Sequence, residues 1–231
     1  MNTKFKLING DALEEIKKIP DKTIDLILTD PPYNISQYSK SNIKIGERNL
    51  NTKIAEWDTV KLRPESFLNE FKRILSPQGN IFIFTSYNLL GEWHKYFDKE
   101  FDTFQFMVWH KNNPVPCVYK KTFLNSCELI ICLWNKGHIW NFTTQNEMHN
   151  FIQSTICSYP ERLKSPRHPT QKPVSILEHI IKIASNENSI VLDPFMGVGS
   201  TGVACSRLNR YFIGIEIDKD YYEAAIKRLS T

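Results

Sequence analysis

Short apolar runs rich in β-forming residues alternate along this chain with segments of helical periodicity. Two of these runs, 24–28 and 81–84, are apolar at nearly every position, which is typical of strands covered on both faces. Parallel neighbours need crossover connections, so the pattern predicts an α/β fold with helices on both faces of a mostly parallel sheet. Seven strands are expected, at 4–8, 25–29, 80–85, 104–110, 128–134, 189–192 and 211–215.

The gaps between these runs carry apolar residues three and four positions apart, which is the spacing of one helix face. In 174–184 these residues are isoleucine and leucine. Pro64 and Pro173 stand where two of the helices would begin, a position that proline favours. Helices are therefore expected at 11–19, 63–75, 174–184 and 219–229.

Composition narrows the class of protein. The five cysteines form no C-x-x-C pair, so neither a disulfide framework nor a zinc site is expected, and no metal is implied. No stretch approaches the roughly 20 apolar residues of a membrane span, and residues 1–10 lack a signal-peptide pattern. The 231 residues are expected to form one domain of a soluble cytoplasmic protein.

Two segments interrupt the alternation. Residues 34–58 are polar and rich in Asn, Ser and Lys, and we expect a mobile loop there. Residues 136–169 mix polar, aromatic and basic side chains. Long loops in compact domains are uncommon and are often functional, so both segments are candidates for contacts with a partner.

A glycine-rich turn follows the expected strand 189–192. Gly197 and Gly199 permit positive φ and close approach of a ligand to the backbone, and Ser200 and Thr201 are expected to cap the next helix. A strand, a tight turn and a helix are the layout of a nucleotide-type cofactor site, although the spacing is not that of a P-loop. An ordinary turn with glycines for packing is the alternative.

An acidic residue at the end of the next strand supports the cofactor interpretation. Glu216 follows Asp193 by 23 positions. This is close to the spacing of roughly 20 residues at which a carboxylate binds ribose hydroxyls in nucleotide-binding folds.

The tetrapeptide Asp30-Pro31-Pro32-Tyr33 follows the expected strand 25–29 directly. The prolines prevent a helix and hold the carboxylate at the strand end. A carboxylate and a proline carbonyl would accept both hydrogens of an exocyclic base amine, and Tyr33 would stack on a flipped base. The alternative is a rigid turn with a capping aspartate.

Together these motifs resemble the amino-methyltransferases that modify adenine N6 or cytosine N4 in DNA. Their motifs (D/N/S)-P-P-(Y/F/W) and D-P-F-x-G-x-G-[ST]-T stand at 30–33 and 193–201, and H-P-T-Q-K-P stands at 168–173. The first precedes the second by 163 positions, an order similar to the circularly permuted β group. The resemblance implies a Rossmann-like methyltransferase fold with a mostly parallel seven-stranded sheet.

The same resemblance implies S-adenosyl-L-methionine as cofactor. Asp11 would accept a hydrogen bond from its adenine, although Asp11 alternatively caps the first helix. The catalytic residues implied are Asp30, Pro31, Pro32 and Tyr33. The cofactor-binding residues implied are Asp11, Ala12, Asp30, His168, Thr170, Gln171, Lys172, Asp193, Phe195, Gly197, Gly199, Ser200, Thr201, Glu216 and Ile217.

Family members with aspartate at the first motif position more often resemble adenine enzymes, so adenine N6 is the expected target. Cytosine N4, an RNA amine and a non-catalytic nucleic-acid-binding homologue remain alternatives. No cysteine nucleophile is required, and the Pro116-Cys117 pair is a weak rival. One catalytic domain over 1–231 is expected, with 136–169 as a small target-recognition insertion.

Two basic stretches flank the expected site, and we expect them to contact the phosphates or bases of double-stranded DNA. For any single lysine simple solvation is the preferred explanation, and DNA contact is preferred for the two stretches taken together. A homodimer and a cognate restriction endonuclease are left open as further partners. The expected DNA contacts are Lys111, Asn112, Asn113, Lys120, Lys121, Arg162, Lys164 and Arg167.

Overall fold

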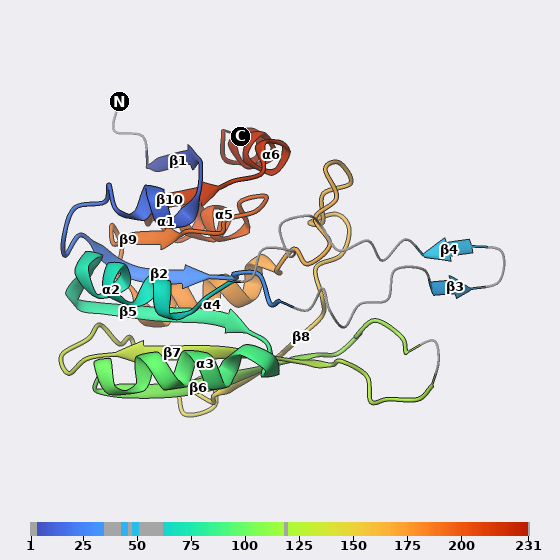
Figure 1. Cartoon of the computed structure of the whole chain (residues 1–231), viewed down its shortest axis with the longest axis horizontal. Coiled ribbons are helices and arrows are strands. Elements are labelled where there is room, and N and C mark those ends of the chain that lie inside the picture. Colours follow the sequence, from blue (N-terminus) through green and yellow to red (C-terminus); the bar gives the residue numbers. More distant parts are fainter. Residues whose placement is uncertain (1–3, 35–42, 46–47, 51–61, 118–119, 231) are drawn as a thin grey trace.

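An eight-stranded sheet forms the centre of the protein in a computed structural model that describes residues 4–34, 43–45, 48–50, 62–117 and 120–230. The strands β1, β10, β9, β2 and β5 are neighbours in this order and pair in parallel, as do β6 and β8, whereas β7 is antiparallel to β5 and β6. The order across the sheet is β1 (Phe5–Asn9), β10 (Tyr211–Glu216), β9 (Ile190–Asp193), β2 (Ile24–Thr29), β5 (Leu75–Thr85), β7 (Cys127–Trp134), β6 (Thr103–Lys111) and β8 (Phe151–Ser154) (Figure 1).

All seven strands expected from the sequence are present, and the mostly parallel α/β architecture is confirmed. The eighth strand, β8, comes from the segment 136–169, where no strand was expected. It pairs with β6 from Val108 opposite Phe151 to Lys111 opposite Ser154. Only four residues long and at the sheet edge, β8 is too short to leave a clear period-two pattern.

Helices cover both faces of the sheet. The helices are α1 (Ala12–Ile16), α2 (Glu65–Ile74), α3 (Tyr87–Phe97), α4 (Val174–Ala184), α5 (Ser200–Arg207) and α6 (Lys219–Leu229), with a short 3-10 helix, η3 (Asp98–Glu100). Helices α1 to α3 pack on one face and α4 to α6 on the other. The helix α3 was not expected, although Leu89, Trp93 and Phe97 form a buried stripe four residues apart.

The central strand β5 shows how the sheet joins these two layers. Ile81 and Ile83 point into the layer of α1 to α3, and Phe82 and Phe84 point into the layer of α4 to α6. All four side chains are at most 1% exposed. Burial of each such side chain stabilises the fold by about 1.5–3 kcal/mol before packing is counted.

Adjacent strands explain how distant motifs meet. In the pairing of β2 with β9, Leu26 lies opposite Val191 and Ile27 opposite Leu192. Because these strands run in parallel, the chain leaves both of them at the same edge of the sheet. The tetrapeptide after β2 and the glycine turn after β9 therefore lie side by side, although their motifs begin 163 positions apart in the sequence.

The first strand of the chain completes the sheet beside the last one. Along the pairing of β1 with β10, Asn9 lies opposite Glu216, and the Asn9 side-chain amide donates to the Glu216 carbonyl at 2.8 Å. This neighbour relation is the one implied by the circularly permuted motif order.

The expected mobile loop 34–58 lies mostly outside the described residues. Within it, β3 (Ile43–Ile45) and β4 (Arg48–Leu50) pair in an antiparallel hairpin. At the start of this segment the Asn34 side-chain amide donates to the Leu62 carbonyl, and its oxygen accepts from the Leu62 N–H. Among the helices that the structure describes, each is too short or too polar to cross a membrane.

Candidate active site

Asp30 stands directly after β2 and begins a rigid turn. Its side chain is 20% exposed, and the next residue, Pro31, is buried. The Tyr33 hydroxyl donates to Asp30 Oδ1 at 2.7 Å, so the turn closes on its own carboxylate. Two prolines and this hydrogen bond hold the carboxylate at the sheet edge.

Lys172 forms an ion pair with this carboxylate. Its Nζ donates to Asp30 Oδ2 at 2.5 Å, and its side chain is only 6% exposed. Pro173 is the N-cap of α4, so the helix start places the preceding lysine against the end of β2. The ammonium also lies 5.3 Å from the centre of the Tyr33 ring and 5.2 Å from that of Phe84.

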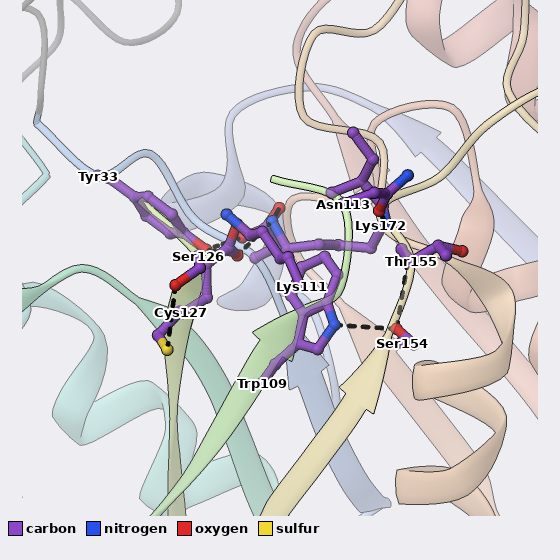
Figure 2. A network of polar contacts seen from close by, with 12 residues as sticks. Tyr33, Trp109, Lys111, Asn113, Ser126, Cys127, Ser154, Thr155 and Lys172 are labelled. Atoms are coloured by element: carbon purple, nitrogen blue, oxygen red, sulfur yellow. Dashed lines mark hydrogen bonds and ion pairs between the residues drawn. The ribbon is translucent and has the colours of Figure 1, made fainter. Parts of the chain in front are cut away.

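A second carboxylate, Glu128 near the start of β7, completes the cluster. Its Oε2 accepts from the Tyr33 hydroxyl at 3.1 Å and lies 3.2 Å from Lys172 Nζ, and its Oε1 lies 2.7 Å from Lys111 Nζ. In Figure 2 the side chains of Tyr33, Lys111 and Lys172 converge from three different segments. Two carboxylates and two ammonium groups therefore form a compact, nearly dry cluster, which we call the Asp30 cluster (Asp30, Tyr33, Lys111, Glu128 and Lys172).

The charges in this cluster shift one another's pKa values. Burial raises the pKa of Asp30, and Lys172 opposes that rise while Glu128 adds to it. Burial would also raise the pKa of Glu128, but Lys172 and Lys111 outweigh it and the pKa lies below its usual value. Burial would lower the pKa of Lys172, but Asp30 and Glu128 together raise it. The ammonium thus stays charged at neutral pH.

The glycine turn lies between β9 and α5. Gly197 has φ of 52° and Gly199 has φ of 80°, which is the left-handed region that favours glycine. Gly199 itself is the N-cap of α5, and no side chain caps this helix. The expected capping by Ser200 and Thr201 is therefore wrong: Thr201 donates to Asp193, and Ser200 accepts from Arg228.

Asp193 braces this turn from within. Its side chain is 3% exposed and accepts from the Thr201 hydroxyl at 2.6 Å, the Thr29 hydroxyl at 3.0 Å and the Phe195 N–H at 3.1 Å. Burial raises its pKa to about 7, since only neutral groups donate to it. The contact with Thr29 also ties the turn to the end of β2.

Glu216 holds the other side of the turn. Its Oε2 accepts from the Gly197 N–H and its Oε1 from the Asp218 N–H, both at 2.8 Å. Burial raises the pKa of this carboxyl group as well. A carboxylate oxygen has two lone pairs, so each oxygen keeps one acceptor position that these bonds do not use.

The segment 168–173 connects the two halves of the site. The His168 ring packs on Tyr221 of α6, with ring centres 4.7 Å apart, and a Cβ atom at Gly197 would lie 3.2 Å from its Nε2. Burial, and then Lys172, lower the pKa of His168 to about 4, so the ring is neutral at physiological pH. Four residues later Lys172 reaches Asp30, so one segment contacts both the glycine turn and the Asp30 cluster.

Other expected cofactor residues are placed as follows. Asp11 caps α1 by accepting from the Glu14 N–H at 3.1 Å, which bears out the capping alternative, and Ala12 is buried. Phe195 packs on Phe67 at 5.6 Å between ring centres. The side chain of Gln171 bonds to the backbone of Glu161 and Leu163. Thr170 and Ile217 are exposed.

The structure divides the residues expected to contact DNA. The Lys111 ammonium lies on Glu128 and its side chain is only 12% exposed, so it does not face outward with the others. Asn113 accepts from the Ile156 N–H, and Arg162 donates to the carbonyls of His168 and Pro169. Lys111 and Arg162 are partly buried, and the residues that remain exposed are Asn112, Asn113, Lys120, Lys121, Lys164 and Arg167.

Sequence reasoning missed Glu128. The available signal was a single acidic residue in the otherwise apolar strand Cys127–Trp134. It also missed the pairing of Lys172, which was assigned to the cofactor. Nothing local marks a lysine as the partner of a carboxylate 142 positions away.

The chain belongs to the DNA methylase family of N6-adenine and N4-cytosine methyltransferases, whose family model matches residues 24–227. Among curated proteins it is 33% identical to the type II methyltransferase M.HinfI of Haemophilus influenzae, over 96% of this chain and 67% of that protein. It is 31% identical to the type II methyltransferase M2.LlaDCHI of Lactococcus lactis subsp. cremoris, over 97% of this chain and 88% of that protein.

Solved structures show the same architecture. The crystal structure of an M1.HpyAVI–SAM complex has a TM-score of 0.69 and 32% sequence identity, with 97% of this chain and all of that one covered. The cytosine-N4-specific PvuII DNA methyltransferase has a TM-score of 0.71 at 18% identity, with 98% and 86% covered. The second likeness concerns the fold alone.

Proposed function

We propose that this chain transfers a methyl group from S-adenosyl-L-methionine to N6 of adenine in a short sequence of double-stranded DNA. The observation that carries the proposal is the Asp30 carboxylate, held next to the Pro31 carbonyl at the end of β2 and tied through Thr29 and Asp193 to the glycine turn. This arrangement puts an acceptor pair for an amine beside a turn suited to a nucleoside. Membership of the DNA methylase family supports it.

The residues of the glycine turn fit S-adenosylmethionine. The acceptor positions of Glu216 that Gly197 and Asp218 leave open suit ribose hydroxyls, and left-handed Gly197 and Gly199 let a ligand approach the backbone. When bound, this cofactor supplies a methyl group activated by a positively charged sulfur. Its contacts are proposed at Asp11, Ala12, His168, Thr170, Phe195, Gly197, Gly199, Glu216 and Ile217.

Asp193, Gln171 and Lys172 take supporting roles in this proposal. Asp193 and Gln171 shape the backbone, because their polar atoms bond within the protein. Lys172 holds Asp30 instead of the cofactor. Ser200 and Thr201 likewise fix the start of α5 through Arg228 and Asp193.

At the reacting centre, Asp30 and the Pro31 carbonyl would accept the two hydrogens of the exocyclic amine. This interaction opposes delocalisation of the nitrogen lone pair into the ring and directs it toward transfer. Neither Pro31 nor Pro32 has an N–H that competes as a donor. The Tyr33 hydroxyl is bonded to Asp30 and Glu128, which orients the ring for stacking on the base.

Adenine is favoured over cytosine by the aspartate at position 30, since family members with serine there more often resemble cytosine enzymes. The amine of a stacked, paired base cannot reach a carboxylate that is only 20% exposed. Base flipping is therefore part of the proposal.

Exposed basic residues supply the DNA contacts in this proposal. Lys120 and Lys121 lie between β6 and β7, and Lys164 and Arg167 precede the segment that contacts the cluster. Cations at these positions would neutralise phosphates. A homodimer and a cognate restriction endonuclease remain predictions, which light scattering and a search for cleavage of unmethylated DNA would test.

Nucleoside analysis tests the proposal directly. Unmethylated genomic DNA is incubated with the protein and S-adenosylmethionine, digested to nucleosides and analysed by mass spectrometry. N6-methyladenine is the expected product. N4-methylcytosine without N6-methyladenine would overturn the choice of base, and labelled methyl transfer to RNA but not to duplex DNA would overturn the choice of substrate.

A further inference from the structure

Glu128 shares both of the donors that hold Asp30. The Tyr33 hydroxyl lies 2.7 Å from Asp30 Oδ1 and 3.1 Å from Glu128 Oε2. Lys172 Nζ lies 2.5 Å from Asp30 Oδ2 and 3.2 Å from that same Glu128 oxygen. Asp30 and Glu128 therefore compete for one hydroxyl and one ammonium.

Lys111 makes this sharing possible. It binds the other oxygen of Glu128 at 2.7 Å, and loss of this cation would leave Glu128 and Asp30 to share the charge of Lys172 alone. The cluster thus holds two negative and two positive charges, with Glu128 side chain 15% exposed and Lys111 side chain 12% exposed. Because Lys111 neutralises Glu128, the Lys172 charge remains available to Asp30.

We propose that Glu128 is a positioning residue for methyl transfer, which draws Lys172 and Tyr33 partly away from Asp30 so that Asp30 remains a strong acceptor for the target amine. The inference rests on the proposed role of Asp30. Without Glu128, both donors would turn fully to Asp30, and the amine would compete against an undivided ion pair. Nothing about the family motifs points to this residue, which lies in β7 outside all three of them.

Electrostatics supports the same role. The negative charge of Glu128 raises the pKa of Asp30, and the positive charge of Lys172 opposes the rise. The other groups that face the cluster are Lys111 on β6, Tyr33, Asp193 beside β2, and neutral His168 near Lys172. A more basic carboxylate accepts a hydrogen bond more strongly, while the charge of Lys172 favours its ionised form.

The test compares Glu128→Gln and Lys172→Met by the pH dependence of kcat on unmethylated genomic DNA. Glu128→Gln is expected to lower kcat by about tenfold or more and to move the acid limb of the profile toward lower pH by about one unit. Lys172→Met is expected to move that limb toward higher pH. Opposite displacements are the signature of two charges acting on one carboxyl group.

Controls separate this role from a structural one. Glu128→Asp keeps the charge, so its acid limb is expected at the wild-type position even where kcat falls. Glu178→Gln, on α4 and paired with Arg207, is the matched control and is expected to leave both kcat and the limb unchanged. Affinity for S-adenosylmethionine, measured by calorimetry, reports folding of every variant.

The inference is overturned if Glu128→Gln lowers kcat equally at every pH, or if it leaves kcat unchanged. Failure of the proposed function would be seen in a different variant. In that case Asp30→Ala would retain methyl transfer, whatever the effect of Glu128→Gln. If Glu128→Gln does not fold, the double variant Glu128→Gln with Lys172→Met replaces both charges. Its acid limb is expected between those of Lys172→Met and the wild type, and a limb identical to that of Lys172→Met would contradict the proposal.

Discussion

Each half of the site buries two carboxylates, and the two halves satisfy them with different partners. Asp30 and Glu128 bind ammonium groups, from Lys172 and Lys111. Asp193 and Glu216 bind hydroxyls and backbone N–H groups at distances of 2.6 to 3.1 Å. The strands that carry these residues are neighbours or near neighbours in one sheet.

The two kinds of partner have different effects on the charge and on the position of a carboxylate. Cations favour the ionised form of a buried carboxylate. A hydrogen bond between an ammonium group and a carboxylate is roughly twice as strong as one between two neutral groups. Burial raises the pKa of both Asp30 and Asp193, but the charge of Lys172 opposes the rise at Asp30, whereas only neutral donors oppose it at Asp193, whose pKa is about 7. The Asp30 cluster is therefore arranged to keep a charge, and the glycine turn is arranged to keep a backbone conformation.

Removal of Lys172 is the strongest way to break this contrast. Lys172→Met leaves Asp30 and Glu128 with Lys111 as the one remaining cation of the cluster, and loss of one partner from a buried ion pair costs about 3–5 kcal/mol. We expect a loss of that size in the free energy of unfolding, measured with urea. Lys182→Met, an exposed position on α4, should change it by less than about 0.5 kcal/mol. A Lys172→Met variant as stable as the wild type would show that the cluster is not buried as described.

Glu216 tests the cofactor half. Glu216→Gln keeps the size of the side chain but loses the negative charge that would accept ribose hydroxyls. A hydrogen bond to a charged group contributes about 1.5–3 kcal/mol, so we expect the Kd for S-adenosylmethionine to rise by at least about tenfold. Glu223→Gln on the exposed face of α6 is the matched control. Equal affinity in the Glu216→Gln variant would remove this residue from the cofactor site.

Asp193 links the stability of the glycine turn to pH. Its folded-state pKa of about 7 lies above the ordinary value of 3.8, so the folded protein binds this proton more tightly than the unfolded chain. Its contribution to stability is therefore fully present below about pH 4 and is lost as the pH rises through about 7.

Asp193→Asn removes that titration. Measured without cofactor, the Tm of the wild type minus the Tm of this variant should fall as the pH rises from 5 to 8, because only the wild type loses this contribution. A difference that stays constant across this range would show that Asp193 does not titrate there.

The smallest expected effect concerns the exposed lysines. Replacement of Lys120 and Lys121 by Gln should weaken DNA binding a few-fold and reduce the slope of log K against log salt by up to about 1.8, or 0.9 for each phosphate contact. Lys17 and Lys18, paired with Glu14 and Glu15 near the opposite edge of the sheet, are the control pair. An unchanged salt slope would place the DNA elsewhere on the surface.

The sequence was sufficient for seven of the eight strands of the main sheet and for the meeting of the two motifs. Strand periodicity placed β2 and β9, and the motif order correctly implied that β1 lies beside β10. These predictions succeed because strand direction and helix crossover leave few topologies open. The strand β8 was not predicted because it is short, and the helix α3 was not predicted because it contains Gly91 among aromatic residues.

The contacts within the site were harder to predict. The sequence does not mark Lys111 or Lys172 as the partner of a carboxylate, yet both ammonium groups lie on Glu128, and that of Lys172 also lies on Asp30. These contacts depend on the pairing of β6 with β7 and on the angle at which α4 begins, which are properties of tertiary packing. The resemblance identified residues that lie within short sequence motifs, but it did not identify Glu128, which lies outside these motifs and contacts Tyr33 and Lys172.

Asp30→Ala tests the central claim most directly. Labelled methyl transfer to DNA is measured alongside calorimetric binding of S-adenosylmethionine by the same preparation. The account predicts that transfer falls by a factor of roughly 1,000 or more, about 4 kcal/mol in the barrier, while cofactor affinity changes little. Transfer at the wild-type rate by the Asp30→Ala variant would contradict it.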